Sequence, residues 1–158
     1  MKGSPKVIAQ LNEALKEELM AINQYFLHAE MCENWHYHKL ADHIRKESID
    51  EMKHAEALIE RILFLDGSPN MTEPMKITVG SNVKDQLAGD LKLELTGVAM
   101  YNQAVQLARD EGDNVSRELF ERILKEEEGH VDWLEAQLHQ IKELGYERYL
   151  SQQIRDEK

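Results

Sequence analysis

The chain has 158 residues, with 19 Lys and Arg against 30 Asp and Glu, which gives a formal net charge of −11 with neutral histidines. Proteins that bind DNA or RNA neutralise phosphates with clustered cations, so this balance argues against a nucleic-acid partner. The longest apolar run, residues 62–65, is far shorter than the roughly 20 residues that span a membrane. No apolar segment follows Met1-Lys2-Gly3, and the single Cys32 excludes an internal disulfide. We therefore expect a cytoplasmic protein with no export signal and no membrane partner.

The pattern of apolar residues predicts an all-α fold in a single domain over residues 1–158, a length that can bury a real core. Good helix formers dominate the composition, and only 3 Pro and 8 Gly occur. A first helix is predicted from Ser4 as N-cap and Pro5 in the first turn to about Trp35. Its apolar positions recur at helical spacing: Ile8, Leu11, Leu15, Leu19, Ile22, Phe26 and Ala29.

Three further long helices and one short helix follow. A second apolar stripe runs from Leu40 to Ile62 and stops at Gly67, and a segment from 66 to about 81 lacks helical periodicity. The third and fourth helices are predicted to start near residues 81–82 and 113–114 and to stop at Gly112 and Gly145. A short fifth helix is predicted over residues 146–155. Two helical hairpins joined by one long crossover describe a ferritin-like four-helix bundle.

Each of the four long stripes is interrupted in its middle by a glutamate. These residues are Glu18, Glu51, Glu94 and Glu127. An unpaired carboxylate in an apolar core costs several kcal/mol or more, and four facing one another add like-charge repulsion. No Lys or Arg lies beside them on the stripes, so a metal is the better candidate for the missing positive charge.

An internal repeat singles out two histidines as partners of these glutamates. Composition predicts about one Glu-x-x-His by chance, and three occur, at Glu33/His36, Glu51/His54 and Glu127/His130. Glu18 precedes the second motif by the same distance in sequence as Glu94 precedes the third, whereas the first motif has no such partner. Residues three apart on a helix reach the same point, so each hairpin offers one lone Glu and one Glu-His pair.

Six ligands therefore converge in the core. Four carboxylates and two imidazoles suit two octahedral ions such as iron or manganese better than structural zinc, which prefers four ligands rich in Cys and His. Four carboxylates also balance the charge of two divalent ions. This ligand set is that of di-iron and di-manganese carboxylate bundles. The other histidines are expected at the surface or in hydrogen bonds: His28, His36, His38, His43 and His139.

The chain resembles the bacterioferritins. The resemblance runs from residue 1 to about 155 and is clearest at the start Met1-Lys2-Gly3, in the segment 18–26 (ELMAINQYF) and in the segment 47–56 (ESIDEMKHAE). It implies a homo-oligomeric shell of 24 subunits built of two-fold dimers, in which each subunit is a ferroxidase. Fe(II) would be oxidised by dioxygen or hydrogen peroxide and stored as ferric mineral, and a ferredoxin would be the reductant for its release.

The resemblance also implies a role for particular residues. Two iron ions would be held in each subunit, with Glu51 and Glu127 bridging and the other four ligands terminal: Glu18, His54, Glu94 and His130. Tyr25 would hydrogen-bond a ligand carboxylate. Tyr101 occupies the equivalent position of the second repeat. For both tyrosines, core packing with a satisfied hydroxyl is an explanation at least as good as a redox role.

Met52 is implied as an axial ligand of haem b. It lies one residue, about 100° around a helix, from Glu51 and should therefore face outwards. In the bacterioferritins a methionine at this position binds haem from both sides of a two-fold subunit interface. One departure concerns an inner-surface iron site: some bacterioferritins have a histidine where this chain has Lys46, which weakens such a site at Asp50.

Two rival interpretations remain open. A rubrerythrin-type peroxidase or a manganese catalase would use the same bundle and ligands, although the paired Cys-x-x-Cys motifs usual in rubrerythrins are excluded by the single Cys32. A metal-free helical interaction protein would use the four stripes for packing alone.

Overall fold

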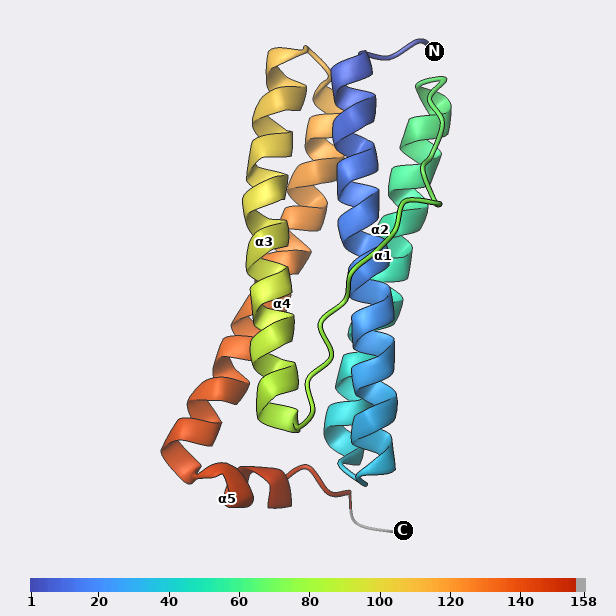
Figure 1. Cartoon of the computed structure of the whole chain (residues 1–158). Coiled ribbons are helices and arrows are strands. Elements are labelled where there is room, and N and C mark those ends of the chain that lie inside the picture. The colour runs from blue at the N-terminus through green and yellow to red at the C-terminus, as the bar shows by residue number, and fades with distance from the viewer. Residues whose placement is uncertain (156–158) are drawn as a thin grey trace.

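The computed structural model describes residues 1–155 and confirms the ferritin-like bundle. Its helices are α1 (Pro5–Asn34), α2 (His38–Phe64), α3 (Val83–Asp110), α4 (Asn114–Leu144) and α5 (Tyr146–Ser151). The four long helices lie side by side along one axis, with α5 across one end (Figure 1). Because α2 and α3 run in the same direction, the chain must travel the length of the bundle between them, which explains the long crossover. The fifth helix, α5, ends at Ser151 and is therefore shorter than the helix predicted over residues 146–155.

Three of the long helices, α1, α3 and α4, begin after a residue whose side chain accepts a hydrogen bond from the first turn. Ser4 accepts from the N–H of Val7, and Pro5 follows it at the start of α1, as predicted. Asn82 accepts from the N–H of Asp85, and Asp113 caps α4 in the same way. These contacts satisfy backbone donors that have no partner within the helix, which sets where these three helices begin.

The core consists of two apolar clusters separated by a polar layer. One cluster lies towards the beginning of α1 and includes Leu11, Leu58 and Phe120. The other lies towards the end of α1 and includes Leu40 and Leu134. On every long helix, the interrupting glutamate falls between residues of one cluster and residues of the other. The bundle is therefore apolar at both ends and charged in its middle.

One position on the predicted stripe of the first helix is wrong. Phe26 is 57% exposed, whereas Ala21 and Tyr25 are buried in its place. Neighbouring residues of a helix lie about 100° apart around its axis, so Phe26 points away from the core when Tyr25, the residue before it, points inwards. This leaves an aromatic side chain on the outer surface of α1.

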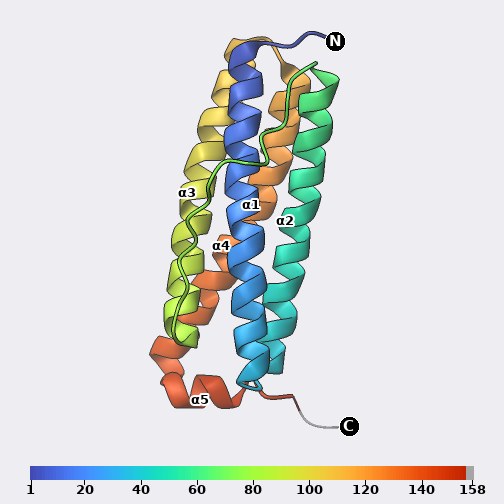
Figure 2. The same cartoon turned by 45° about the vertical axis from the view of Figure 1, so that its right-hand side comes forward.

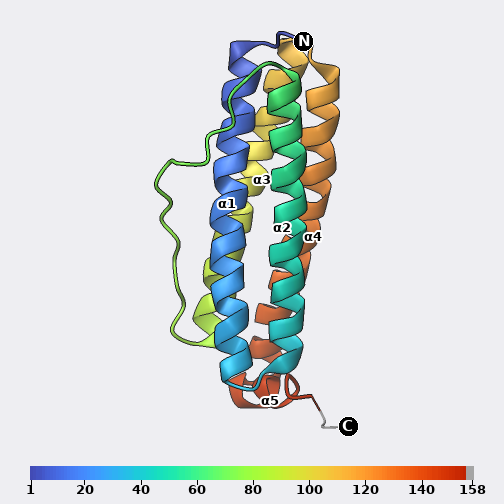
Figure 3. The ribbon, with the colours of Figure 1, turned by 90° about the vertical axis from the view of Figure 1, so that its right-hand side faces the viewer.

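The crossover, residues 65–82, follows the outer side of α1 from the end of α2 to the start of α3 (Figures 2 and 3). Near its end it is tied down by a buried network. The N–H of Gly80 donates to Nε2 of His28 over 3.1 Å, and Nδ1 of His28 lies 2.8 Å from Oδ1 of Asp90. The N–H of Thr78 donates to Gln24, whose amide group donates to the same Asp90 oxygen. His28 is thus hydrogen-bonded, as expected, but fully buried.

Glycine is required at position 80 by this close packing. A Cβ atom there would lie 2.4 Å from the backbone nitrogen of Gln86. We expect Gly80→Ala to lower the free energy of unfolding by about 1–3 kcal/mol, because backbone atoms must move to relieve the overlap. Chemical denaturation of the purified protein measures the change. Gly129→Ala is the matched control, since nothing lies within 4 Å of its added methyl group and alanine favours a helix. Equal stabilities for the two variants would contradict this account.

Candidate metal centre

The polar layer is made by the four predicted glutamates, one from each long helix. Glu18, Glu51, Glu94 and Glu127 retain at most 4% of their exposed surface. Each helix projects its glutamate into the core because the flanking residues on the same face are buried on both sides of it. The carboxylates are therefore held in place by the packing of the apolar clusters above and below them.

The structure groups the six predicted side chains into two overlapping sets of four. One set is Glu18, Glu51, His54 and Glu127, and the other is Glu51, Glu94, Glu127 and His130. Within each set the nearest ligand atoms all lie within 4.8 Å of one another. Glu51 and Glu127 belong to both sets. This is the arrangement that two neighbouring ions with two shared carboxylates require.

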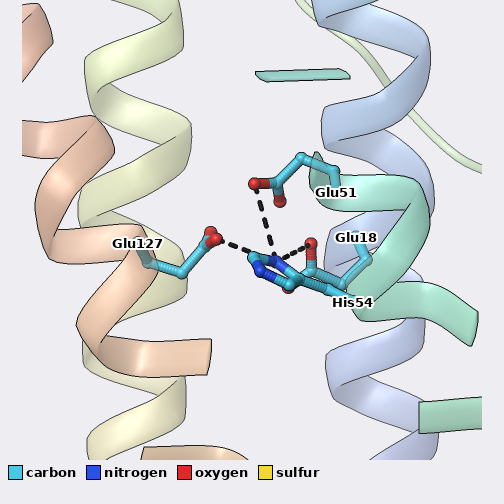
Figure 4. Close-up of side chains that lie close together, drawn as sticks. All are labelled: Glu18, Glu51, His54 and Glu127. Atoms are coloured by element: carbon cyan, nitrogen blue, oxygen red, sulfur yellow. Dashed lines mark ion pairs between the residues drawn. The ribbon is translucent and has the colours of Figure 1, made fainter. Parts of the chain in front are cut away.

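His54 lies at the centre of the first set, and Figure 4 shows the three carboxylates pointing towards it. Its Nδ1 atom is 3.2 Å from Glu127, 3.5 Å from Glu18 and 3.7 Å from Glu51. In the second set, Nδ1 of His130 is 3.0 Å from Glu51 and 3.3 Å from Glu94. The same ring nitrogen thus faces the carboxylates in both sets.

Several carboxylate oxygens in this cluster are buried and have no hydrogen-bond partner. They are Glu18 Oε2, Glu51 Oε1 and Oε2, Glu94 Oε2 and Glu127 Oε1. Leaving such atoms without a partner costs free energy, since the protein interior cannot replace the water they have lost. Hard oxygen donors held around one small volume fit divalent cations such as Fe(II), so the residues present suit the two ions that the sequence predicts.

The cluster shifts the pKa values of its own carboxyl groups. Burial raises the pKa of Glu51 and of Glu127 well above the usual value, and the nearby charge of Glu18 raises both further. Burial acts on Glu18 as well, but its neighbours Glu51 and His54 outweigh it and hold the pKa of Glu18 below the usual value. The shared carboxyl groups therefore keep protons that a bound cation would displace.

The two imidazole rings respond in the opposite direction. Burial lowers the pKa of His54, but the carboxylates of Glu127 and Glu18 outweigh it and raise that pKa above its ordinary value. Burial also acts on His130, where Glu94 outweighs it and raises the pKa to about 9. Without a metal ion, the rings thus carry the positive charge that the carboxylates need.

Each terminal carboxylate is held by a tyrosine from the other hairpin. The hydroxyl of Tyr25 donates to Glu94, as the resemblance implied, and the hydroxyl of Tyr101 donates to Glu18. Burial and the neighbouring carboxylates raise the pKa of both tyrosines well above the usual value, so both stay protonated donors. Since the two tyrosines are separated in sequence by the same distance as the two glutamates, the contacts are related by the internal repeat.

Two acidic residues on the far side of the rings follow the same repeat. Glu126 accepts from Nε2 of His54, and Asp50 lies 3.8 Å from Nε2 of His130. A carboxylate on one ring nitrogen turns the other nitrogen towards a metal. Glu126 was not singled out from the sequence, since its side chain is 50% exposed and only Glu127 of the acidic run faces the core. The available signal was its position in the second repeat, which is equivalent to that of Asp50 in the first.

Met52 lies outside this cluster. Its side chain is 54% exposed on the outer surface of α2, as its position one residue from Glu51 predicts. Phe26 of α1 and Ile49 of α2 are also exposed, at 57% and 46%. None of the helices within residues 1–155 is long and apolar enough to cross a bilayer.

Comparison with known proteins agrees with this geometry. The model of the ferritin-like domain family matches residues 8–144. The bacterioferritin of Brucella melitensis is 47% identical over 149 residues, which cover 94% of this chain and 92% of the relative. The bacterioferritin of Mycolicibacterium paratuberculosis is 45% identical over 96% of both chains. That of Streptomyces coelicolor is 45% identical over 96% of this chain and 90% of the relative.

The matched region contains α1 from residue 8 onwards, the whole of α2, α3 and α4, and all six clustered side chains. The identity to the bacterioferritins extends over nearly the whole chain. The chain therefore belongs to the ferritin-like domain family and, within it, to the bacterioferritins.

Proposed function

We propose that this protein stores iron and that its core cluster is a ferroxidase centre, which oxidises Fe(II) to Fe(III). The observation that carries this proposal is the pair of four-residue sets that share Glu51 and Glu127. Bacterioferritin is also the name of relatives that are 43–47% identical, which supports iron as the ion.

The ligand chemistry supports oxidation rather than simple binding. Four carboxylates and two imidazoles are hard donors with a total charge of about −4 when deprotonated, and such donors stabilise Fe(III) more than Fe(II). Each Fe(II) would give one electron to dioxygen or hydrogen peroxide and leave as the ferric ion. The protein's part is to collect two Fe(II) ions next to one another and to favour the higher charge.

The residues divide the task by their position. Glu51 and Glu127, which belong to both sets, would bridge the two ions. Glu18 with His54 would complete one site, and Glu94 with His130 the other. Tyr25 would fix the orientation of a terminal carboxylate through its hydroxyl. The unpaired oxygens of the cluster argue against a metal-free interaction protein, because packing alone would gain from apolar residues there.

The assembly follows from the family. Bacterioferritins are homo-oligomers, and we infer for this chain a 24-subunit shell of two-fold dimers in the cytoplasm, with ferric mineral inside. Haem b would be bound between two subunits by Met52, whose side chain is exposed on the outside of the bundle. The bound haem would supply a redox group, and a ferredoxin would be the electron donor for iron release.

Loss of a shared carboxylate tests the centre. We expect Glu51→Gln to slow Fe(II) oxidation at least about 100-fold, because even residues that only orient metal ligands cost roughly 10–100-fold when removed. Stopped-flow absorbance of the ferric product measures the rate. Glu56→Gln, an exposed position on the same helix, is the control and should match the unchanged protein. An E51Q variant that oxidises Fe(II) as rapidly as the unchanged protein would contradict the ferroxidase proposal.

Haem binding is tested separately at Met52. We expect Met52→Leu to remove the haem Soret band from the purified protein, because leucine offers no ligand atom to iron. Fe(II) oxidation and the elution of a species far larger than the 18.4 kDa chain should persist. An unchanged Soret band in M52L would exclude Met52 as the axial ligand.

The raised pKa values predict proton release on metal binding. Ligand rings must be neutral, and the pKa of His130 is about 9, so Zn(II) affinity should keep rising between about pH 7 and pH 8.5. An unperturbed ring would give a plateau above its pKa of about 6.5. Calorimetric titration in buffers of different ionisation enthalpy counts the protons. Affinity independent of pH above 7 would contradict the proton-bearing cluster.

A further inference from the structure

Glu17 has a polar atom that the centre described so far does not explain. It directly precedes Glu18 on α1, and its side chain is half-buried. Its Oε2 atom is shielded from solvent and has no hydrogen-bond partner. Such a carboxylate oxygen has lost its hydrogen bonds to water without forming others, which costs free energy. A cation bound next to it would offset this cost.

A small cavity connects Glu17 with the metal centre. It lies between α1 and α3 and has a volume of about 10 Å³, close to the space that one water molecule occupies. The residues lining it are Glu17, Glu18, Ala21, Glu51, Leu93, Glu94, Gly97, Tyr101 and Glu127. Five of these nine are glutamates, and none is a Lys, Arg or His. The four core glutamates supply unpartnered oxygens that are more than nine-tenths buried, so the cavity itself suits a cation.

Gly97 leaves one wall of this cavity without a side chain. A Cβ atom built there would lie 3.8 Å from Oε2 of Glu127, in ordinary contact with a shared carboxylate. A methyl group at position 97 would therefore occupy space next to this carboxylate on the α3 side of the cavity.

Lys16, the cation next to Glu17 in the sequence, is engaged elsewhere. Its ammonium group lies 3.0 Å from Glu73, a residue of the crossover on the outer side of α1. Burial raises the pKa of Glu17, and the neighbouring charge of Lys16 offsets only part of this rise. Of the five glutamates that line the cavity, Glu17 alone is half-exposed, which places it on the side nearest to solvent.

We propose that Glu17 is a transit ligand, which holds Fe(II) between α1 and α3 before the ion passes to Glu18 and the shared carboxylates. This inference rests on the ferroxidase function proposed above. A divalent ion that exchanges its waters for carboxylate oxygens in steps avoids losing its hydration all at once. Glu17 adds such a step at the mouth of the cavity, and Gly97 keeps the next step unobstructed.

The test follows the binding of Co(II), which does not depend on oxidation. Stopped-flow visible absorbance of the assembled protein gives the rate of Co(II) binding, and the endpoint gives the number of ions bound per subunit. The variant is Glu17→Gln, which keeps the shape of the side chain and removes its charge. Glu13→Gln is the matched control, because Glu13 lies one turn earlier on α1, is exposed and does not line the cavity.

We expect E17Q to bind Co(II) about tenfold more slowly, within the range by which charged clefts change association rates. Two ions per subunit and the final spectrum should be unchanged, and E13Q should bind at the original rate. Equal rates for E17Q, E13Q and the unchanged protein would overturn the transit role. So would a lower endpoint for E17Q, which would make Glu17 a permanent ligand. If the unchanged protein itself binds fewer than two ions, the proposed function fails instead.

Gly97→Ala provides a second variant that does not depend on the folding of E17Q. Alanine favours a helix, and its methyl group meets only an ordinary contact, so the protein should fold. Slower Co(II) binding with two ions at the endpoint supports the route between α1 and α3. An unchanged rate in G97A would overturn that route.

Discussion

Four glutamates from four helices meet in the middle of an otherwise apolar bundle, and the cost of bringing them together governs the rest of the structure. None of the four retains more than 4% of its exposed surface, and their charges repel one another. Two histidine rings, two tyrosine hydroxyls and protons on the shared carboxyl groups offset part of this cost. The oxygens that remain unpartnered mark where a cation would complete the balance. The apolar clusters on either side supply the folding free energy that tolerates such a layer.

The internal repeat is preserved at the centre and lost around it. The shared carboxylates, the tyrosines and the acids behind the rings of the first hairpin each have a counterpart at the equivalent position of the second. Gln24 and His28, by contrast, correspond to Met100 and Ala104 in the second hairpin. These two polar side chains hold the crossover against α1. Since the bundle has a single crossover, only one hairpin needs to bind it, and the other could keep apolar residues.

The inner face, the flank and the outer surface of α1 carry residues with different roles. Its inner face contributes Glu18 and Tyr25 to the centre, and its flank towards α3 places Glu17 in the connecting cavity. Its outer surface carries the exposed Phe26, which is on the same hairpin as Met52. An apolar surface of this kind is typical of an interface, and the homo-oligomers of the family provide one. In the two-fold dimer proposed above, a second copy of the chain would complete the burial of such residues.

The four long helices, the crossover and the six clustered core side chains could all be predicted from the sequence. Each of these depends on local or periodic information: capping residues, an apolar stripe with the period of a helix, and an internal repeat of one hairpin. Four other features could be seen only in the tertiary structure. They are the outward position of Phe26, the contact of Glu126 with His54, the buried hydrogen bond between His28 and Asp90, and the cavity beside Glu17. They depend on how far one helix is rotated against its neighbour. A rotation of a few tens of degrees moves a side chain from solvent to the core and changes no residue in the sequence.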